Sequence, residues 1–134
     1  MFPILYILSD FGLLVVRVAL GSILLVHGLP KIKNLKVTAH NFDGMGFKPG
    51  RLWGTLVAIV EFAGGITLIL GFWVQLAAFL VVGEFLVINI WKIVKRQPFV
   101  GGWEFDLLIL AAAIALFSGG GVLSLDRFFS IGAF

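Results

Sequence analysis

Four long apolar segments, separated by shorter polar stretches, organise the chain. They cover about residues 11–29, 52–70, 74–94 and 105–123. Each segment is close to the roughly 20 residues that a helix needs to cross the hydrocarbon core of a bilayer. A span must be helical because lipid offers no hydrogen-bond partners to open backbone groups. The pattern therefore predicts an all-α integral membrane four-helix bundle, with residues 1–134 forming a single membrane domain.

The connections between these segments predict how the spans are arranged. The second and third spans are joined only by Gly71, Phe72 and Trp73, so they should form an antiparallel hairpin. Asp10 is a candidate N-cap for the first span and Pro30 a candidate stop. Four antiparallel spans bring both termini to the same side.

The composition supports a membrane protein and removes several kinds of chemistry. Hydrophobic residues make up 60% of the chain and charged residues only 13%, which is too little polar surface for a water-soluble domain of this size. The absence of cysteine excludes disulfides, thiolate metal sites and a dithiol relay carried by this chain. The two histidines show no metal-ligand spacing, so we expect no metal site.

The basic residues are concentrated in two of the connections. Eight of the ten are Lys31, Lys33, Lys36, Lys48, Arg51, Lys92, Lys95 and Arg96. Cytoplasmic loops carry an excess of Lys and Arg, so residues 30–51 and 95–104 should be cytoplasmic and both termini outside. This clustering points to membrane orientation, and we expect no nucleic-acid partner.

Three charged residues lie inside the apolar spans: Arg17, Glu61 and Glu84. A charge at the bilayer centre costs about 2.5–3.5 kcal/mol on insertion scales, so such residues face the bundle interior and usually pair. Counted from the span ends at ~1.5 Å per residue, all three fall within roughly 5 Å of one level. This predicts a buried Arg–Glu–Glu cluster. One arginine cannot neutralise two carboxylates, so either one glutamate carries a proton or a further donor such as Asn89 or His27 contributes.

Two interpretations of this cluster stay open. It could handle protons or a polar ligand head group, as intramembrane ionisable residues commonly do. It could also serve only helix packing, although polar contacts between membrane helices stabilise by only about 0.6 kcal/mol on average.

A second set, His27, Lys31 and Glu104, lies nearer the cytoplasmic face and could line the mouth of the same cavity. Each has an ordinary explanation as well. Lys31 could be a snorkelling lysine, and Glu104 could complement a helix dipole in the first turn, as Asp106 could. His27 is the stronger candidate because a histidine titrates near neutrality.

Several short segments carry a family resemblance. They are Arg17 to Gly21, His27 to Lys31, Phe42 with Gly46-Phe47, Glu61 to Gly65, Leu70-Gly71, Gly102 to Glu104, and the tail from Gly119 to Gly121 through Ser124 to Asp126. In this order and spacing the chain resembles the DoxX family (DoxX/DoxD-like small four-helix membrane proteins). The resemblance covers nearly the whole chain.

The resemblance implies a place in a membrane oxidoreductase system of a prokaryotic cytoplasmic membrane. Relatives form the small subunit of a thiosulfate:quinone oxidoreductase. Because this chain lacks cysteine, a thiol relay like that of some similar quinone reductases is excluded for this chain alone.

The expectation is therefore a membrane subunit of a quinone-linked oxidoreductase, with quinone as a non-covalent cofactor. Arg17, Glu61 and Glu84 would handle protons or polarise a quinone oxygen, while His27, Lys31 and Glu104 would form the mouth of the site. Other membrane or membrane-associated subunits would supply the redox centre. The alternatives are a non-catalytic accessory or assembly subunit and a small transporter. The sequence leaves open whether this chain is itself catalytic.

Overall fold

The computed structural model describes residues 3–117, with side chains from residue 8 onward. In this part of the chain all regular secondary structure is helical. The elements are α1 (Pro3–Lys33), α2 (Leu35–Met45), α3 (Gly50–Leu70), α4 (Val74–Val94), the short π-helical turn η1 (Phe99–Trp103) and α5 (Glu104–Leu116). The predicted all-α fold is confirmed.

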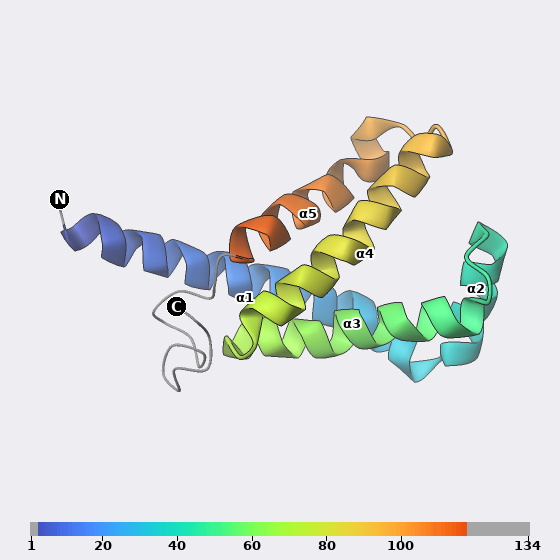
Figure 1. The fold of residues 1–134 in the computed structure, drawn as a ribbon, viewed down its shortest axis with the longest axis horizontal. Coiled ribbons are helices and arrows are strands. Elements are labelled where there is room, and N and C mark those ends of the chain that lie inside the picture. Colours follow the sequence, from blue (N-terminus) through green and yellow to red (C-terminus); the bar gives the residue numbers. More distant parts are fainter. Residues whose placement is uncertain (1–2, 118–134) are drawn as a thin grey trace.

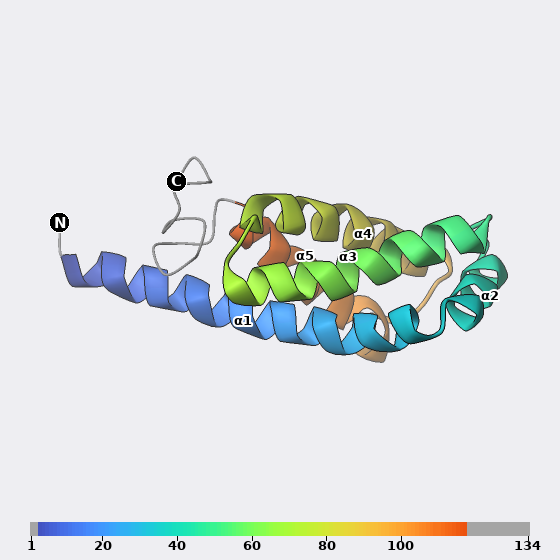
Figure 2. The same cartoon turned by 90° about the horizontal axis from the view of Figure 1, so that it is seen from below.

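The long helices pack as two pairs. α1 packs most extensively against α3, while α4 packs against both α5 and α3. Figures 1 and 2 show α1 antiparallel to α3, and the α4–α5 pair diverging from the α1–α3 pair towards one end. We call this the loop end, because α2 and η1 lie there. The α3–α4 turn lies at the opposite end.

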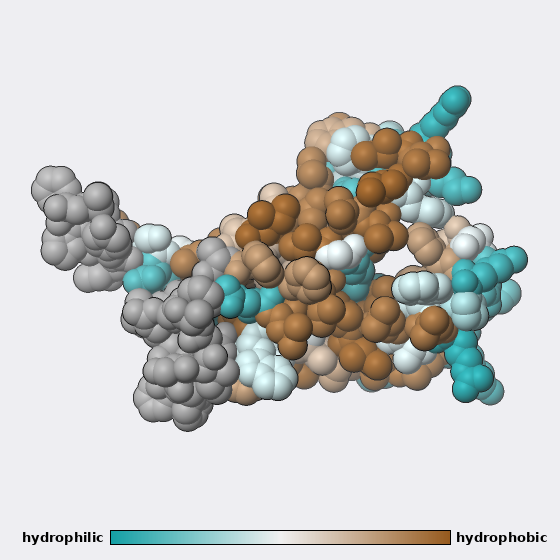
Figure 3. All heavy atoms as spheres, in the orientation of Figure 1, coloured by the Kyte–Doolittle hydropathy of each residue, from teal (hydrophilic) through white to brown (hydrophobic). Residues whose placement is uncertain are grey.

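Within the described residues, four helical segments are long and apolar enough to cross a membrane: Leu8–Lys33, Gly50–Leu70, Val74–Val94 and Phe99–Leu116. Their outward faces carry many exposed large hydrophobic side chains, including Val26, Phe79 and Leu108. Figure 3 shows this apolar body with hydrophilic side chains gathered at the loop end. The chain is a multi-pass membrane protein.

The first helix differs from the expectation at both ends. α1 is already helical before Asp10 and continues through Pro30 to Lys33, so neither the N-cap nor the stop was predicted correctly. Proline disrupts a helix by removing the hydrogen bond to the residue four positions earlier. Pro30 lies in the last turn, where only that one internal bond is lost.

The stretch expected to be a loop contains the helix α2. Asn34 separates α1 from α2, and its side chain accepts a hydrogen bond from the backbone N–H of Val37 (3.3 Å), as an N-cap does. α2 packs on the first turns of α3 at Gly50, where an added Cβ would overlap the carbonyl oxygen of Ala39. The start of α3 is therefore covered by α2 and extends beyond the end of α1.

The predicted hairpin is formed by α3 and α4. α3 ends at Leu70, and Gly71 adopts a left-handed conformation (φ 76°) that glycine tolerates, with its N–H donating to the carbonyl of Thr67. α4 then begins at Val74. The predicted end of the fourth span at residue 123 and the segments from Gly119 to Asp126 lie outside the described residues.

Candidate functional site

Close contact between α1 and α3 fixes which residues of the two helices face each other. A Cβ added to Gly28 would lie 2.5 Å from the backbone nitrogen of Phe62 and 2.9 Å from Cβ of Glu61. A Cβ added to Gly21 would lie 2.7 Å from the carbonyl oxygen of Gly65. The two backbones touch at both glycines, so Glu61 lies level with Gly28.

An ion pair joins the same two helices. Lys31 Nζ lies 2.6 Å from Glu61 Oε2, and the side chains are 32% and 3% exposed. Lys31 follows Gly28 by three residues and so projects from the same face of α1. A hydrogen bond between two charged groups at this distance is among the stronger polar contacts in proteins.

Glu84 on α4 completes the site. Its carboxyl group interacts with that of Glu61 and with the charge of Lys31. Both of its oxygens are buried, and no hydrogen bond of good geometry reaches either one from the part of the chain that is described. We call Lys31, Glu61 and Glu84 the Lys–Glu–Glu site. With one ammonium group and two carboxyl groups in apolar surroundings, charges balance only if one carboxyl group holds a proton.

Arg17 lies in another part of the bundle. It is buried (2% exposed) on α1, but it precedes Gly28 by eleven residues. That separation places it roughly 16 Å along the helix from the level of Glu61. The expectation that Arg17 shares a level with both glutamates fails because α3 extends past the end of α1 under α2. The cation that the structure brings to Glu61 is Lys31.

The other two residues expected at the mouth lie on the surface. His27 is exposed, and its ring centroid is 6.2 Å from that of Phe105 on α5. Glu104 is also exposed and accepts a hydrogen bond from the backbone N–H of Gly101 (3.1 Å). Their role in binding a ligand stays a prediction.

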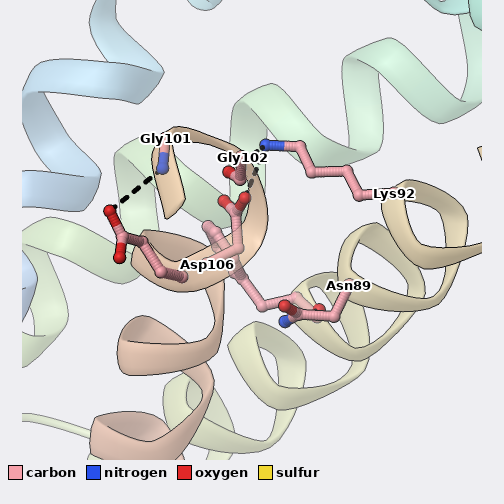
Figure 4. A network of polar contacts seen from close by, with 7 residues as sticks. Asn89, Lys92, Gly101, Gly102 and Asp106 are labelled. Atoms are coloured by element: carbon pink, nitrogen blue, oxygen red, sulfur yellow. Dashed lines mark hydrogen bonds and ion pairs between the residues drawn. The ribbon is translucent and has the colours of Figure 1, made fainter. Parts of the chain in front are cut away.

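A second polar network lies between α4 and α5, and the sequence reasoning missed it. Lys92 Nζ lies 2.5 Å from Asp106 Oδ2 and 3.4 Å from the carbonyl oxygen of Gly102. Asn89, 4% exposed, donates from Nδ2 to the carbonyl of Phe85 (2.7 Å). Figure 4 shows Asn89 in the same region as Lys92 and Asp106. The hydrogen bond of its amide runs to its own helix and not to a glutamate. The sequence does carry a signal for this pair: Lys92 and Asp106 have opposite charges and lie on either side of the short connection between α4 and α5.

An apolar groove of about 160 Å³ runs along the outer surface between α3 and α4. Thr67 and Trp73 line one end, and Val60 and Leu80 line the other. Leu80 precedes Glu84 by one helical turn, about 6 Å, and Val60 adjoins Glu61 in the sequence. The groove therefore leads from the lipid-facing surface to within one turn of the Lys–Glu–Glu site.

These features define a small multi-pass membrane protein with an ionised site inside its helix bundle. Comparison with known families identifies which one. The DoxX family model matches residues 12–95, and the chain belongs to the DoxX family. The matched range contains the whole Lys–Glu–Glu site and ends before Asp106.

One relative of known name covers most of the chain. It is a protein of Bacillus subtilis (strain 168) named "Putative oxidoreductase CatD", 29% identical over 124 residues, which cover 89% of this chain and 87% of the relative. No solved structure matches this chain.

Proposed function

We propose that this chain is the membrane-embedded subunit of a quinone-linked oxidoreductase system, and that the Lys–Glu–Glu site receives the quinone head group. The observation that carries the proposal is the buried Glu84 carboxyl group, which interacts with that of Glu61 beside the Lys31–Glu61 ion pair and accepts no well-formed hydrogen bond among the described residues. The DoxX membership and the name of the Bacillus relative agree with an oxidoreductase system.

The donors at the site fit a quinone. Each quinone carbonyl oxygen accepts hydrogen bonds, and the available donors are the Lys31 ammonium group and the proton that one carboxyl group holds. Reduction of a quinone to a quinol takes up two electrons and two protons. The electrons would come from a partner subunit. This chain has no cysteine, and its described residues include no cluster of His, Asp or Glu side chains that could hold a redox-active metal.

The residues of this chain would then bind, orient and protonate. Lys31 would orient one quinone oxygen. The Glu61–Glu84 pair would hold a proton next to that oxygen and be reloaded from the side on which Lys31 is partly exposed. The apolar groove between α3 and α4 would take the ring or tail from the lipid, since cofactor sites are mostly apolar with a few placed polar groups. By its excess of basic residues the loop end would face the cytoplasm.

Packing alone is a second candidate function for the site, because the Lys31–Glu61 pair joins α1 to α3. A packing role accounts for Glu61 but does not explain why a second buried carboxyl group, that of Glu84, lies against Glu61. A substitution of Glu84 therefore distinguishes a ligand site from a packing contact.

The test is equilibrium binding of a ubiquinone and a menaquinone analogue to the purified full chain in detergent. We expect saturable binding by the wild type and its loss in Glu84→Gln and Lys31→Met. Lys36→Gln removes an exposed charge outside the site and should bind as the wild type does. Arg17→Gln should also keep binding, because Arg17 lies far along α1 from Glu61. If the wild type binds neither analogue, the quinone proposal is wrong and a packing or accessory role replaces it.

A further inference from the structure

A contact at the loop end joins the two halves of the bundle. Trp91 on α4 donates from Nε1 to the carbonyl oxygen of Met45, the last residue of α2, at 3.1 Å. The ring of Trp91 also lies 6.2 Å from the ring of Phe47 in the α2–α3 connection. The end of α4 is thereby held beside the corner between α2 and α3.

Four exposed cations flank this contact. Lys48 follows Phe47 directly and Arg51 lies in the first turn of α3, while Lys95 and Arg96 lie within about one and a half turns after Trp91. We call these four residues the basic rim. Figure 3 shows hydrophilic side chains projecting from this end on both the α2 side and the side of the α4–η1 connection.

The positive charge of the basic rim is not consumed by neighbouring acids. The two ion pairs found among the described residues, Lys31–Glu61 and Lys92–Asp106, use none of its four members. The carboxylates nearest in the chain are engaged with backbone instead. Asp43 accepts from the N–H of Gly50 at 2.7 Å, and Glu104 accepts from the N–H of Gly101 at 3.1 Å.

The backbone of Arg96 adopts a conformation that a residue with a side chain rarely adopts. Arg96 follows α4 with φ 57°, and its N–H donates to the carbonyl of Ile93, as at the left-handed position that often ends a helix. Glycine is strongly favoured at that position because other side chains are strained there. Here the position holds an exposed arginine.

Exposed apolar side chains lie immediately next to these cations. Leu52 and Trp53 follow Arg51, and Ile93 and Val94 precede Lys95, and all four are exposed. A change from lipid-facing apolar residues to Lys and Arg within one or two positions marks the depth at which acyl chains give way to head groups. The basic rim therefore lies at phosphate depth.

We propose that the basic rim binds the phosphate groups of anionic phospholipids in the leaflet at the loop end. Basic groups of this kind attract anionic lipid through charge and through hydrogen bonds to phosphate oxygens. The inference does not depend on quinone binding, and it assigns the basic rim a lipid partner in addition to any role in topology.

The test places the full chain in phosphatidylcholine bilayers containing a trace of spin-labelled phosphatidylglycerol or spin-labelled phosphatidylcholine. The motionally restricted fraction in the electron paramagnetic resonance spectrum gives the association of each lipid with the protein. We expect a preference for phosphatidylglycerol in low salt. The preference should weaken in about 0.5 M NaCl, because at that ionic strength the Debye length is below ~8 Å and exposed charges are screened. Neutralising one cation of the basic rim should lower the preference for phosphatidylglycerol over phosphatidylcholine by up to about fivefold.

Matched variants locate the site. Lys48→Gln with Arg51→Gln, and Lys95→Gln with Arg96→Gln, should each lower the preference, whereas Lys33→Gln with Lys36→Gln removes the same charge outside the basic rim and should lower it less. If a double variant does not insert, Arg96→Lys, which keeps the charge, and Arg96→Gly, which relieves the backbone, decide between charge and conformation. Equal loss in all three double variants, no preference in the wild type, or retention in Arg96→Gly with loss in Arg96→Lys would overturn the proposal.

Discussion

Replacing Lys31 by methionine tests the central feature of the site, an ion pair of which one member is almost wholly buried. The substitution keeps an unbranched side chain of similar length and removes the charge. Glu61, whose side chain is 3% exposed, then has no cation within hydrogen-bonding distance among the described residues. An unpaired buried charge destabilises by about 3–5 kcal/mol, so the bundle should respond by taking up a second proton.

The size of the effect follows from the cost of that proton. A glutamate side chain in water has a pKa of about 4.3, and each unit between this value and the pH costs about 1.36 kcal/mol. Neutralising one more carboxyl group therefore costs up to about 3.7 kcal/mol at pH 7 and about 1 kcal/mol at pH 5. The sign is definite: the destabilisation by Lys31→Met should be largest near neutral pH and should shrink as the pH falls.

The assay is unfolding by SDS in mixed micelles, followed by helical circular dichroism at pH 7 and pH 5. Glu61→Gln is the matched variant, because it removes the partner that needs the proton. Its effect should be smaller, since the partly exposed Lys31 can turn its ammonium group towards water, and it should vary little with pH. If Lys31→Met costs under about 1 kcal/mol at pH 7, or the same at both pH values, the reasoning about a dry, proton-holding site is wrong.

Three further predictions concern the contacts that shape the bundle. Gly28→Ala should destabilise it by about 1–3 kcal/mol in the same SDS assay, because its Cβ meets the backbone of α3 at 2.5 Å, while Gly12→Ala, with nothing within 4 Å, should not. Asn34→Ala should cost about 0.5–2 kcal/mol and speed amide hydrogen exchange in α2, which loses its N-cap; unchanged exchange would show that the cap contributes nothing. Trp91→Phe removes the hydrogen bond to Met45 and should lower stability by about 0.5–1.5 kcal/mol, which a thermal melt would detect; equal melts would refute it.

The sequence was sufficient for the elements that depend on local composition. The long apolar runs predicted the spanning helices, and the three-residue connection at Gly71 predicted the hairpin of α3 and α4. It also singled out Glu61 and Glu84, which meet because they lie on the two arms of that hairpin.

What the sequence did not predict depends on the stagger between helices that are distant in the chain. Treating Pro30 as a stop and residues 30–51 as a loop aligned the ends of α1 and α3, and that alignment put Arg17 beside Glu61. The contact of Gly28 with Glu61 and the helix α2 shift α3 along α1 and bring in Lys31 instead. A stagger of this kind is set by close backbone packing, which hydropathy does not report. The Lys92–Asp106 pair was missed for a different reason: its opposite charges flank one short connection, and finding it required that α4 and α5 be expected to face each other at η1.

The tight turn at Gly71 sets how far along each helix of the hairpin Glu61 and Glu84 lie. Glu61 lies nine residues before the end of α3, and Glu84 lies ten residues after the start of α4, so both carboxyl groups stand about 14–15 Å from the turn. The two acids thus meet because nearly equal numbers of residues, nine and ten, separate them from the two sides of the turn. One residue inserted in either arm between the turn and its glutamate would advance that side chain by about 1.5 Å and rotate it by about 100°. The spacing between Glu61 and Glu84 therefore carries as much information as the residues themselves, and length changes there should be far less tolerated than substitutions on the lipid-facing surface.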